Sequence, residues 1–327
     1  MWTLAAFRGT VLGVAQDAQR VAWLQWSPDG CRLRFGSRAT KAIRSVRYAT
    51  RCNPFFHELV LARGGAAWAG DDEITCGKMF ATVYAYAGGR ARLVQRIPRD
   101  CYGFGLSLRG LATDGRAFYY NVFETIKPAS AWQCGGGGVC SWQLGRGHIA
   151  RVDGARPVVL RRLPPTVMLA VSAGRVLLVQ PLGRSSTSGG WPRAARNGRV
   201  EVRDLATGRV EVSFRPEGIV RSVALTPSRA VVLVELNGLR SVETYDVRTG
   251  RLVRSASAPL SLRRLPQDGD LVPYVVNDQV RVFDVSTGET SVVAETKLNP
   301  VGLTISNGWV VWGENRTKFA RIRVARA

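Results

Sequence analysis

The sequence predicts an all-β fold, a seven-bladed β-propeller of four-stranded antiparallel blades. Three observations support this prediction. A short strand pattern recurs seven times, its copies begin 38 to 59 residues apart, and a second, turn-forming motif recurs in the C-terminal half. Propeller blades are about 40 to 50 residues long, so each copy corresponds to one blade.

In the first pattern, a starting residue precedes two small or apolar residues and then a bulky one. Most copies follow a turn-forming pair such as Asp114-Gly115 or Asn307-Gly308, as expected for tight hairpins. The seven copies occupy residues 20–23, 65–68, 116–119, 175–178, 229–232, 271–274 and 309–312.

The second pattern is a strand of alternating residues that continues into Asp-x-x-Thr-Gly, at residues 204–208, 246–250 and 284–288. The Asp and Thr side chains of such a motif bond to turn amides, and the Gly accepts the left-handed backbone of the reversal. We therefore expect each copy to close an outer hairpin of a blade.

Together the two patterns resemble the WD40-like, YVTN-type, quinoprotein-type and TolB-like bacterial β-propellers. The resemblance covers nearly the whole chain and is specific to the fold. It implies a seven-bladed ring, and it implies that ligands enter on the face where the second strand of each blade connects to the third. That superfamily includes binding scaffolds, lyases, lactonases and dehydrogenases, so the resemblance fixes no single activity.

The N-terminal residues are expected to close the ring. The last blade provides too few strands of its own, and residues 2–7 are apolar enough to pair there, which removes an exposed sheet edge. An alternative interpretation is that they are the remnant of an export signal. The chain 1–327 then forms one propeller domain with long loop insertions at about 124–147 and 182–197.

Composition narrows the possible partners. The formal net charge is +22, but it comes from 46 Lys and Arg residues that are dispersed along the chain. Only five of these residues are lysines, a skew that codon usage in a GC-rich genome produces. Non-specific polyanion binding is expected at low salt. No apolar run reaches the length of a membrane span.

Six cysteines in the first half of the chain point to an oxidising compartment. Their symmetric placement about proposed reversals predicts the pairs Cys31–Cys52, Cys76–Cys101 and Cys134–Cys140. We therefore expect an extracellular, periplasmic or cell-surface protein. Buried thiols in a cytosolic propeller are the alternative.

The two insertions contain aromatic, arginine and glycine residues, a composition typical of interfaces and stacking platforms. The same tryptophans are also compatible with simply holding long loops onto the propeller. The candidate ligand-binding residues are Trp132, Trp142, Trp191, Arg193 and Arg196.

Evidence for catalysis is weaker at this level. An acidic run after the blade-two strand is able to hold a hard cation with more distant carboxylates, although an acidic surface turn is the simpler explanation. Neither His57 nor His148 has a partner fixed by spacing, and a nucleophile elbow is missing from the sequence. The candidate metal ligands are Asp71, Asp72, Glu73, Glu124 and Glu314.

These observations predict a non-catalytic, exported propeller that binds a protein, a glycan or another ligand through one face of the ring. The first alternative is a propeller enzyme, a lyase or hydrolase, with a metal- or histidine-dependent site at the channel mouth. The second alternative is polyanion binding. No cofactor is predicted, and a monomer is expected.

Overall fold

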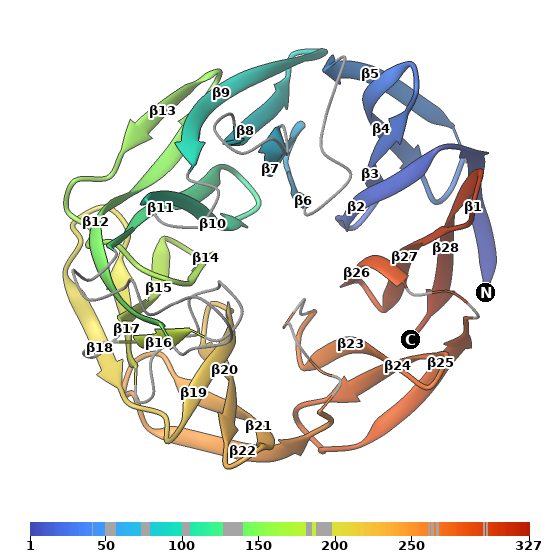
Figure 1. Cartoon of the computed structure of the whole chain (residues 1–327). Helices are drawn as coiled ribbons and strands as arrows, with labels where there is room; N and C mark the ends of the chain where they lie inside the picture. The colour runs from blue at the N-terminus through green and yellow to red at the C-terminus, as the bar shows by residue number, and fades with distance from the viewer. Residues whose placement is uncertain are drawn as a thin grey trace.

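A computed structural model describes most of the chain and shows a ring of antiparallel sheets (Figure 1). Its described residues contain strands, turns and bends but no helix. They are 1–40, 42–49, 57–72, 79–99, 105–126, 140–180, 185–187, 198–260, 262, 265, 268–296, 298 and 300–327. The predicted all-β, seven-bladed fold is confirmed.

The first three blades follow one another along the chain, each ordered from the ring axis outward. Blade one contains β2 (Thr10–Gln16), β3 (Arg20–Ser27), β4 (Gly30–Ser37) and β5 (Ile43–Ala49). Blade two contains β6 (His57–Ala62), β7 (Gly65–Asp72), β8 (Met79–Ala87) and β9 (Arg90–Arg99). Blade three contains β10 (Gly105–Thr113), β11 (Phe118–Ile126), β12 (Cys140–Asp153) and β13 (Arg156–Val159).

The next three blades continue this order. Blade four contains β14 (Leu169–Ser172), β15 (Arg175–Gln180), β17 (Arg199–Asp204) and β18 (Val210–Phe214). Blade five contains β19 (Ile219–Leu225), β20 (Arg229–Leu236), β21 (Leu239–Asp246) and β22 (Leu252–Ala258). Blade six shows β23 (Leu271–Val276), β24 (Gln279–Asp284) and β25 (Thr290–Glu295), and the chain before β23 is only partly described.

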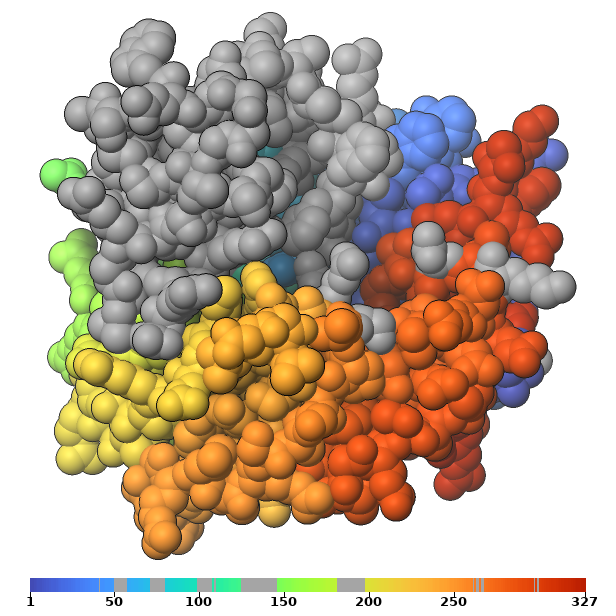
Figure 2. Space-filling view, turned by 60° about the horizontal axis from the view of Figure 1, so that its bottom comes forward, coloured from blue at the N-terminus to red at the C-terminus, as the bar shows by residue number. Residues whose placement is uncertain are grey.

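Blade seven closes the ring with strands from both ends of the chain. It contains β26 (Pro300–Ser306), β27 (Trp309–Asn315) and β28 (Phe319–Arg326), and β1 (Trp2–Arg8) is its outermost strand. The register runs from Trp2 opposite Val324 to Arg8 opposite Phe319. The prediction that the N-terminal strand closes the ring is therefore confirmed. In Figures 1 and 2 the blue and red ends of the chain lie side by side.

The bulky residue of each repeat forms the core of its blade. All seven are at most 4% exposed, and the three tryptophans among them are fully buried. They are Trp23, Trp68, Tyr119, Leu178, Val232, Tyr274 and Trp312. Because successive strand residues point to opposite faces, these side chains and their neighbours pack against the sheets on either side.

The Asp-x-x-Thr-Gly motifs form the expected turns. Asp204 Oδ1 accepts hydrogen bonds of 2.7 Å from both the Thr207 backbone N–H and the Thr207 hydroxyl, and Gly208 has φ of +74°. Asp246 and Thr249 repeat this arrangement in blade five. The sequence thus specifies these outer hairpins locally.

One strand pairing joins two blades and was not predicted. The first residues of β12 extend beyond blade three and pair with the short strand β16 (Ser185–Thr187), which lies in the connection between β15 and β17 of blade four. Cys140 lies opposite Thr187 and Trp142 opposite Ser185. The two long insertions therefore meet in a small antiparallel ladder. In the part of the chain described here, no helix is long and apolar enough to span a membrane.

Candidate functional site

The strand ends on one edge of the ring bring several predicted residues into neighbouring blades. We call the edge where β3 turns into β4, and where β7 leads to β8 and β11 to β12, the upper edge. His57 begins β6 there, opposite Gly70 in the ladder, and Asp71 and Asp72 end β7. Glu124 lies near the end of β11 in the next blade, opposite Leu106. The upper edge of blades two and three is therefore the candidate site.

His148 lies within this region on β12. It is opposite Val122 in the β11–β12 ladder, and Glu124 is two residues farther along β11. Diagonal neighbours of this kind are about 7–8 Å apart. Val122 and Ala150 belong to the hydrophobic cluster between blades two and three, so strand alternation places Glu124 and His148 on the same side of the sheet.

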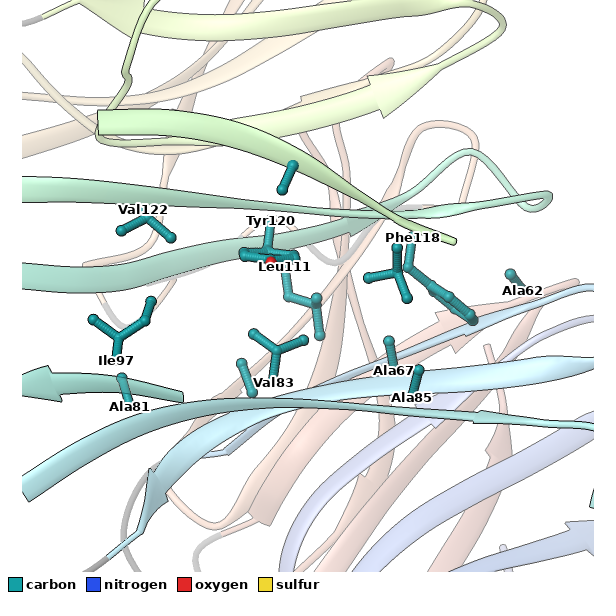
Figure 3. Close-up of a cluster of buried hydrophobic side chains, with 13 residues drawn as sticks. Ala62, Ala67, Ala81, Val83, Ala85, Ile97, Leu111, Phe118, Tyr120 and Val122 are labelled. Carbon is teal, nitrogen blue, oxygen red and sulfur yellow. The ribbon is translucent and has the colours of Figure 1, made fainter. Parts of the chain in front are cut away.

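The packing beneath these residues is tight and apolar. Figure 3 shows Val83, Ile97 and Tyr120 among the cluster of apolar side chains between the two blades. Small residues such as Ala81 and Ala85 let the sheets approach. This cluster forms a rigid base from which the upper-edge side chains project.

His148 is suited to accept a proton. Its side chain is half-buried and makes no hydrogen bond or ion pair with the described chain. Burial lowers the pKa of His148 from its ordinary 6.5, because desolvation disfavours the charged imidazolium. The imidazole is consequently neutral at pH 7, the form that acts as a general base or a metal ligand.

Arg146 adds a positive charge on the same strand as His148. It lies two residues before His148, where β12 bulges opposite Glu124, and it is exposed. Its backbone N–H donates a hydrogen bond of 3.2 Å to Glu124 Oε2. Its guanidinium forms no ion pair within the described residues and is available to an anionic substrate.

The sequence prediction did not include Arg146. The available signal was strand alternation in Arg146-Gly147-His148, at the end of the first insertion. Alternation alone does not say which of many arginines lacks an acidic partner, so this residue emerges only from the fold.

Glu58 links the inner strands of the same two blades. Its Oε2 accepts a hydrogen bond of 3.0 Å from the Leu111 backbone N–H. This contact fixes β6 against β10 and uses one oxygen of a carboxylate that the sequence had not singled out. The hydrogen bond thereby positions β6, whose first residue is His57.

Glu314 lies elsewhere, in blade seven. It is 1% exposed, and its Oε1 accepts hydrogen bonds of 3.0 Å from both the Thr296 hydroxyl and the Trp312 indole N–H. Its Oε2 accepts a hydrogen bond from Arg321. Both oxygens are thus committed within the protein, and Glu314 does not join the upper-edge residues of blades two and three.

Most other predicted site residues lie outside what the structure describes. Asp71 and Asp72 are placed only by their register opposite Ala81 and Phe80, and Trp142 only by its pairing with Ser185. The residues outside the described part are Glu73, Trp132, Trp191, Arg193 and Arg196. Among the described residues, no three His, Cys, Asp or Glu side chains form a group that holds a metal ion.

Of the six cysteines, Cys31 is the one whose side chain the structure describes. Cys31 is fully buried and disulfide-bonded. Cys140 has a described backbone within β12. Cys52, Cys76, Cys101 and Cys134 lie outside the described residues. All three predicted pairings therefore stay predictions.

No protein-family model and no curated protein matches this chain. Solved structures are similar in fold. An oligogalacturonate lyase from Vibrio parahaemolyticus has a TM-score of 0.60 at 9% identity, with 99% of this chain and 92% of that chain covered. An oligogalacturonate lyase in complex with manganese has a TM-score of 0.57 at 11% identity, with 100% and 98% covered.

A puromycin-hydrolyzing peptidase from Mycobacterium tuberculosis has a TM-score of 0.55 at 11% identity. The alignment covers 98% of this chain but 54% of the peptidase, so this chain corresponds to about half of that enzyme. At such identities these likenesses establish the propeller fold alone.

The comparisons correct the prediction of a non-catalytic scaffold. That prediction rested on the lack of a recognisable catalytic motif, yet the similar structures named above are enzymes, two of them matched over nearly their full length. The lack of a motif in a propeller sequence is therefore no argument against catalysis. The enzyme alternative agrees better with these findings.

Proposed function

We propose that this protein is a propeller enzyme, a lyase that cleaves an acidic polysaccharide at the upper edge of blades two and three. The observation that supports it most directly is a neutral imidazole, His148, without a hydrogen-bond or ion-pair partner among the described residues, and an exposed guanidinium, Arg146, two residues away on β12. The fold likeness to two oligogalacturonate lyases supports the choice of reaction class. The net charge of +22 favours an anionic polymer as substrate.

The proposed reaction is a β-elimination. His148 removes the proton from the ring carbon next to the uronate carboxylate, and the electron pair forms a double bond to the neighbouring carbon. The glycosidic C–O bond on that carbon breaks, and the departing oxygen takes a proton from solvent. No water is added, and the products are one saturated and one unsaturated sugar end.

Arg146 has a distinct role in this scheme. Removing a proton next to a carboxylate places further negative charge on that carboxylate, and a forked guanidinium stabilises it in the transition state. The bond from the Arg146 backbone to Glu124 fixes the bulge that presents the side chain. Glu124 is thus a positioning residue.

The experiment is an assay of the purified chain on polygalacturonate, alginate and glucuronan, following the ultraviolet absorbance of the unsaturated product. We expect the chain to cleave one of these polymers. In His148→Gln the cleavage rate should fall by about 10²–10⁴-fold. Arg146→Gln alone should lower the cleavage rate by a comparable factor, and Arg146→Lys should lower it by less. The matched control is Arg248→Gln, an exposed arginine in a blade-five turn.

The pH profile provides a second test. A base whose pKa lies below 6.5 keeps full activity at neutral pH and loses it as the pH falls through that lowered value. Absence of unsaturated product from all three polymers would refute the lyase proposal. Cleavage that needs His57 but not His148 would keep a histidine-dependent enzyme and reject His148 as its base.

We further propose that the protein is exported and contains disulfides, and that it belongs to the WD40-like, YVTN-type and TolB-like propellers that its turns resemble. Cys31 and the even number of cysteines support export. Intact mass before and after alkylation, with and without reductant, tests it. Six alkylatable thiols without reductant would contradict the proposal.

A further inference from the structure

The seam between blades one and seven contains a row of arginines that face the N-terminal strand. Arg34 of β4 lies over the ring of Phe7, with its guanidinium carbon 5.5 Å from the ring centroid. A Cβ on Gly36 would lie 3.1 Å from Leu4 Cδ2. Alternate residues of β4 therefore point at β1, and strand alternation adds Arg32 to the row.

Positive charge accumulates along this seam. Arg32 lies directly opposite Arg47 in the β4–β5 ladder, an arrangement of like charges that destabilises a sheet. The Arg34 Nε–H is buried and has no acceptor in the described part of the chain. In the described chain, no ion pair involves Arg32, Arg34 or Arg47. The nearby carboxylates are already used, Asp17 by Arg20 and Glu314 by Arg321.

At the lower edge, the one opposite the candidate active site, the seam opens into a cavity of about 790 Å³. Its lining is mainly apolar and includes the indoles of Trp2 and Trp309 together with Arg38. A cavity of this size accommodates a small ligand. In Figure 2 the red residues of blade seven and the blue residues of blade one meet at the right of the view.

Arg38 is held in place at the cavity wall. Its Nη1 donates a hydrogen bond of 2.6 Å to Gln16 Oε1, and its Nη2 donates to the carbonyl oxygens of Asp17 and Ala18. Gln16 in turn donates a hydrogen bond of 2.6 Å to the Trp309 carbonyl oxygen. Arg38 is thus linked through Gln16 to the β27 backbone at Trp309, and the Arg38 Nε–H is left for a ligand.

We propose that this seam is a second binding site, for an acidic sugar unit. An indole face stacks on the apolar face of a sugar ring, and a guanidinium pairs with its carboxylate. The choice of an acidic sugar rests on the proposed function, because it makes the seam a place where the same polymer is held away from the site of cleavage. A ligand seated here bridges β1 and blade one, so its binding stabilises the closed ring.

The experiment measures binding of a galacturonate trisaccharide to the full chain by calorimetry and by thermal unfolding. The matched ligand is the same trisaccharide with its carboxylates reduced to alcohols. We expect the acidic trisaccharide to raise the unfolding temperature and the reduced one to bind at least about tenfold more weakly. To prevent turnover, the measurements use His148→Gln as the background.

Arg38→Gln should weaken binding about tenfold, and Trp309→Leu, which removes an aromatic lining residue, should weaken it by a smaller factor. Because Arg38 also holds the β2–β3 turn, Trp309→Leu provides the test if Arg38→Gln folds poorly. The control Arg248→Gln removes the same charge in blade five and should bind as the parent does.

Three outcomes overturn the seam proposal. They are equal binding of both trisaccharides, equal weakening by Arg248→Gln, and tighter binding of a single-stranded oligonucleotide than of the acidic sugar. If the parent chain cleaves the polymer but the trisaccharide does not bind at the seam, this site is rejected and the lyase proposal stands. Seam binding without cleavage in the parent chain would reject the lyase and keep the site.

Discussion

Blade seven and blade two place a tryptophan at the same position of the repeat and treat it differently. Trp312 of blade seven donates its indole N–H to Glu314, 3.0 Å away. Trp68 of blade two is equally buried, but its indole N–H has no acceptor among the residues that the structure describes. It packs between aromatic rings instead, stacked on Tyr84 with centroids 5.4 Å apart and edge-on to Tyr48 at 4.9 Å.

This difference follows from how each blade is held together. Blade seven is completed by a strand from the other end of the chain, and Glu314 joins its parts: Thr296 before β26, Trp312 on β27 and Arg321 on β28. Blade two is built from consecutive strands and packs through alanines and rings. In blade seven a directional polar network around Glu314 is thus added to the apolar packing that the repeat specifies, whereas the tryptophan of blade two is held by rings and alanines.

The sharpest way to break this comparison is Glu314→Ala. It leaves an indole N–H, a hydroxyl and the guanidinium of Arg321 without their acceptor, so the free energy of unfolding should fall by about 3–5 kcal/mol. Chemical denaturation measures this loss. The matched control is Glu211→Ala, which removes a partly exposed partner of Arg175 and should cost at most about 1 kcal/mol. Equal losses would mean that the network has no special role.

The same carboxylate predicts how acid weakens the ring closure. Burial alone would raise the pKa of Glu314, but hydrogen bonds from Trp312, Arg321 and Thr296 outweigh it and lower the pKa below the ordinary 4.5. Its contribution to stability is therefore complete above pH 4.5 and is lost as the pH falls through the lowered value. Unfolding midpoints measured from pH 7 to 3 should fall less steeply in Glu314→Gln than in the parent. Parallel curves would contradict this assignment.

The sequence predicted the architecture well because propeller blades are encoded locally. The bulky repeat residue, the turn glycines and the Asp-Thr turns each act within a few residues, and β1 was recognised as the closing strand from its apolar character. The polar features were missed for a different reason. Glu314 and Arg321 meet across neighbouring strands, and Arg38 reaches Trp309 through Gln16, from nearly opposite ends of the chain. Their significance depends on which carboxylates are already paired, which only the fold reveals.

Function was predicted less well than fold. The first interpretation took the tryptophans and arginines of the insertions as a scaffold's binding face, and the similar enzyme structures overturned it. His148 was noted in the sequence but given no partner, because Glu124 lies at the far end of the first insertion. The β11–β12 ladder brings Glu124 close to His148.

Blade two should be sensitive to added volume at its interface with blade three. Ala69 lies in the cluster between blades two and three, where small residues let the sheets approach. Ala69→Leu forces extra atoms into this space and should lower the free energy of unfolding by about 1–3 kcal/mol. Leu93→Phe, at an exposed position on the outer strand of the same blade, is the control and should change little. A neutral Ala69→Leu would show that this interface is loosely packed.

The smallest effect tests the two tryptophans directly. Trp312→Phe removes a donor from Glu314, whereas Trp68→Phe removes an N–H that has no acceptor, and both lose similar apolar area. Because an unsatisfied buried donor is unfavourable and a satisfied one is favourable, Trp312→Phe should be the more destabilising by about 1 kcal/mol. Denaturant midpoints of the two single variants, compared at equal slope, measure the difference. If Trp68→Phe lowers the free energy of unfolding as much as Trp312→Phe does, the rings around Trp68 stabilise its N–H as well as a carboxylate would. The two blades would then differ only in the shape of their packing.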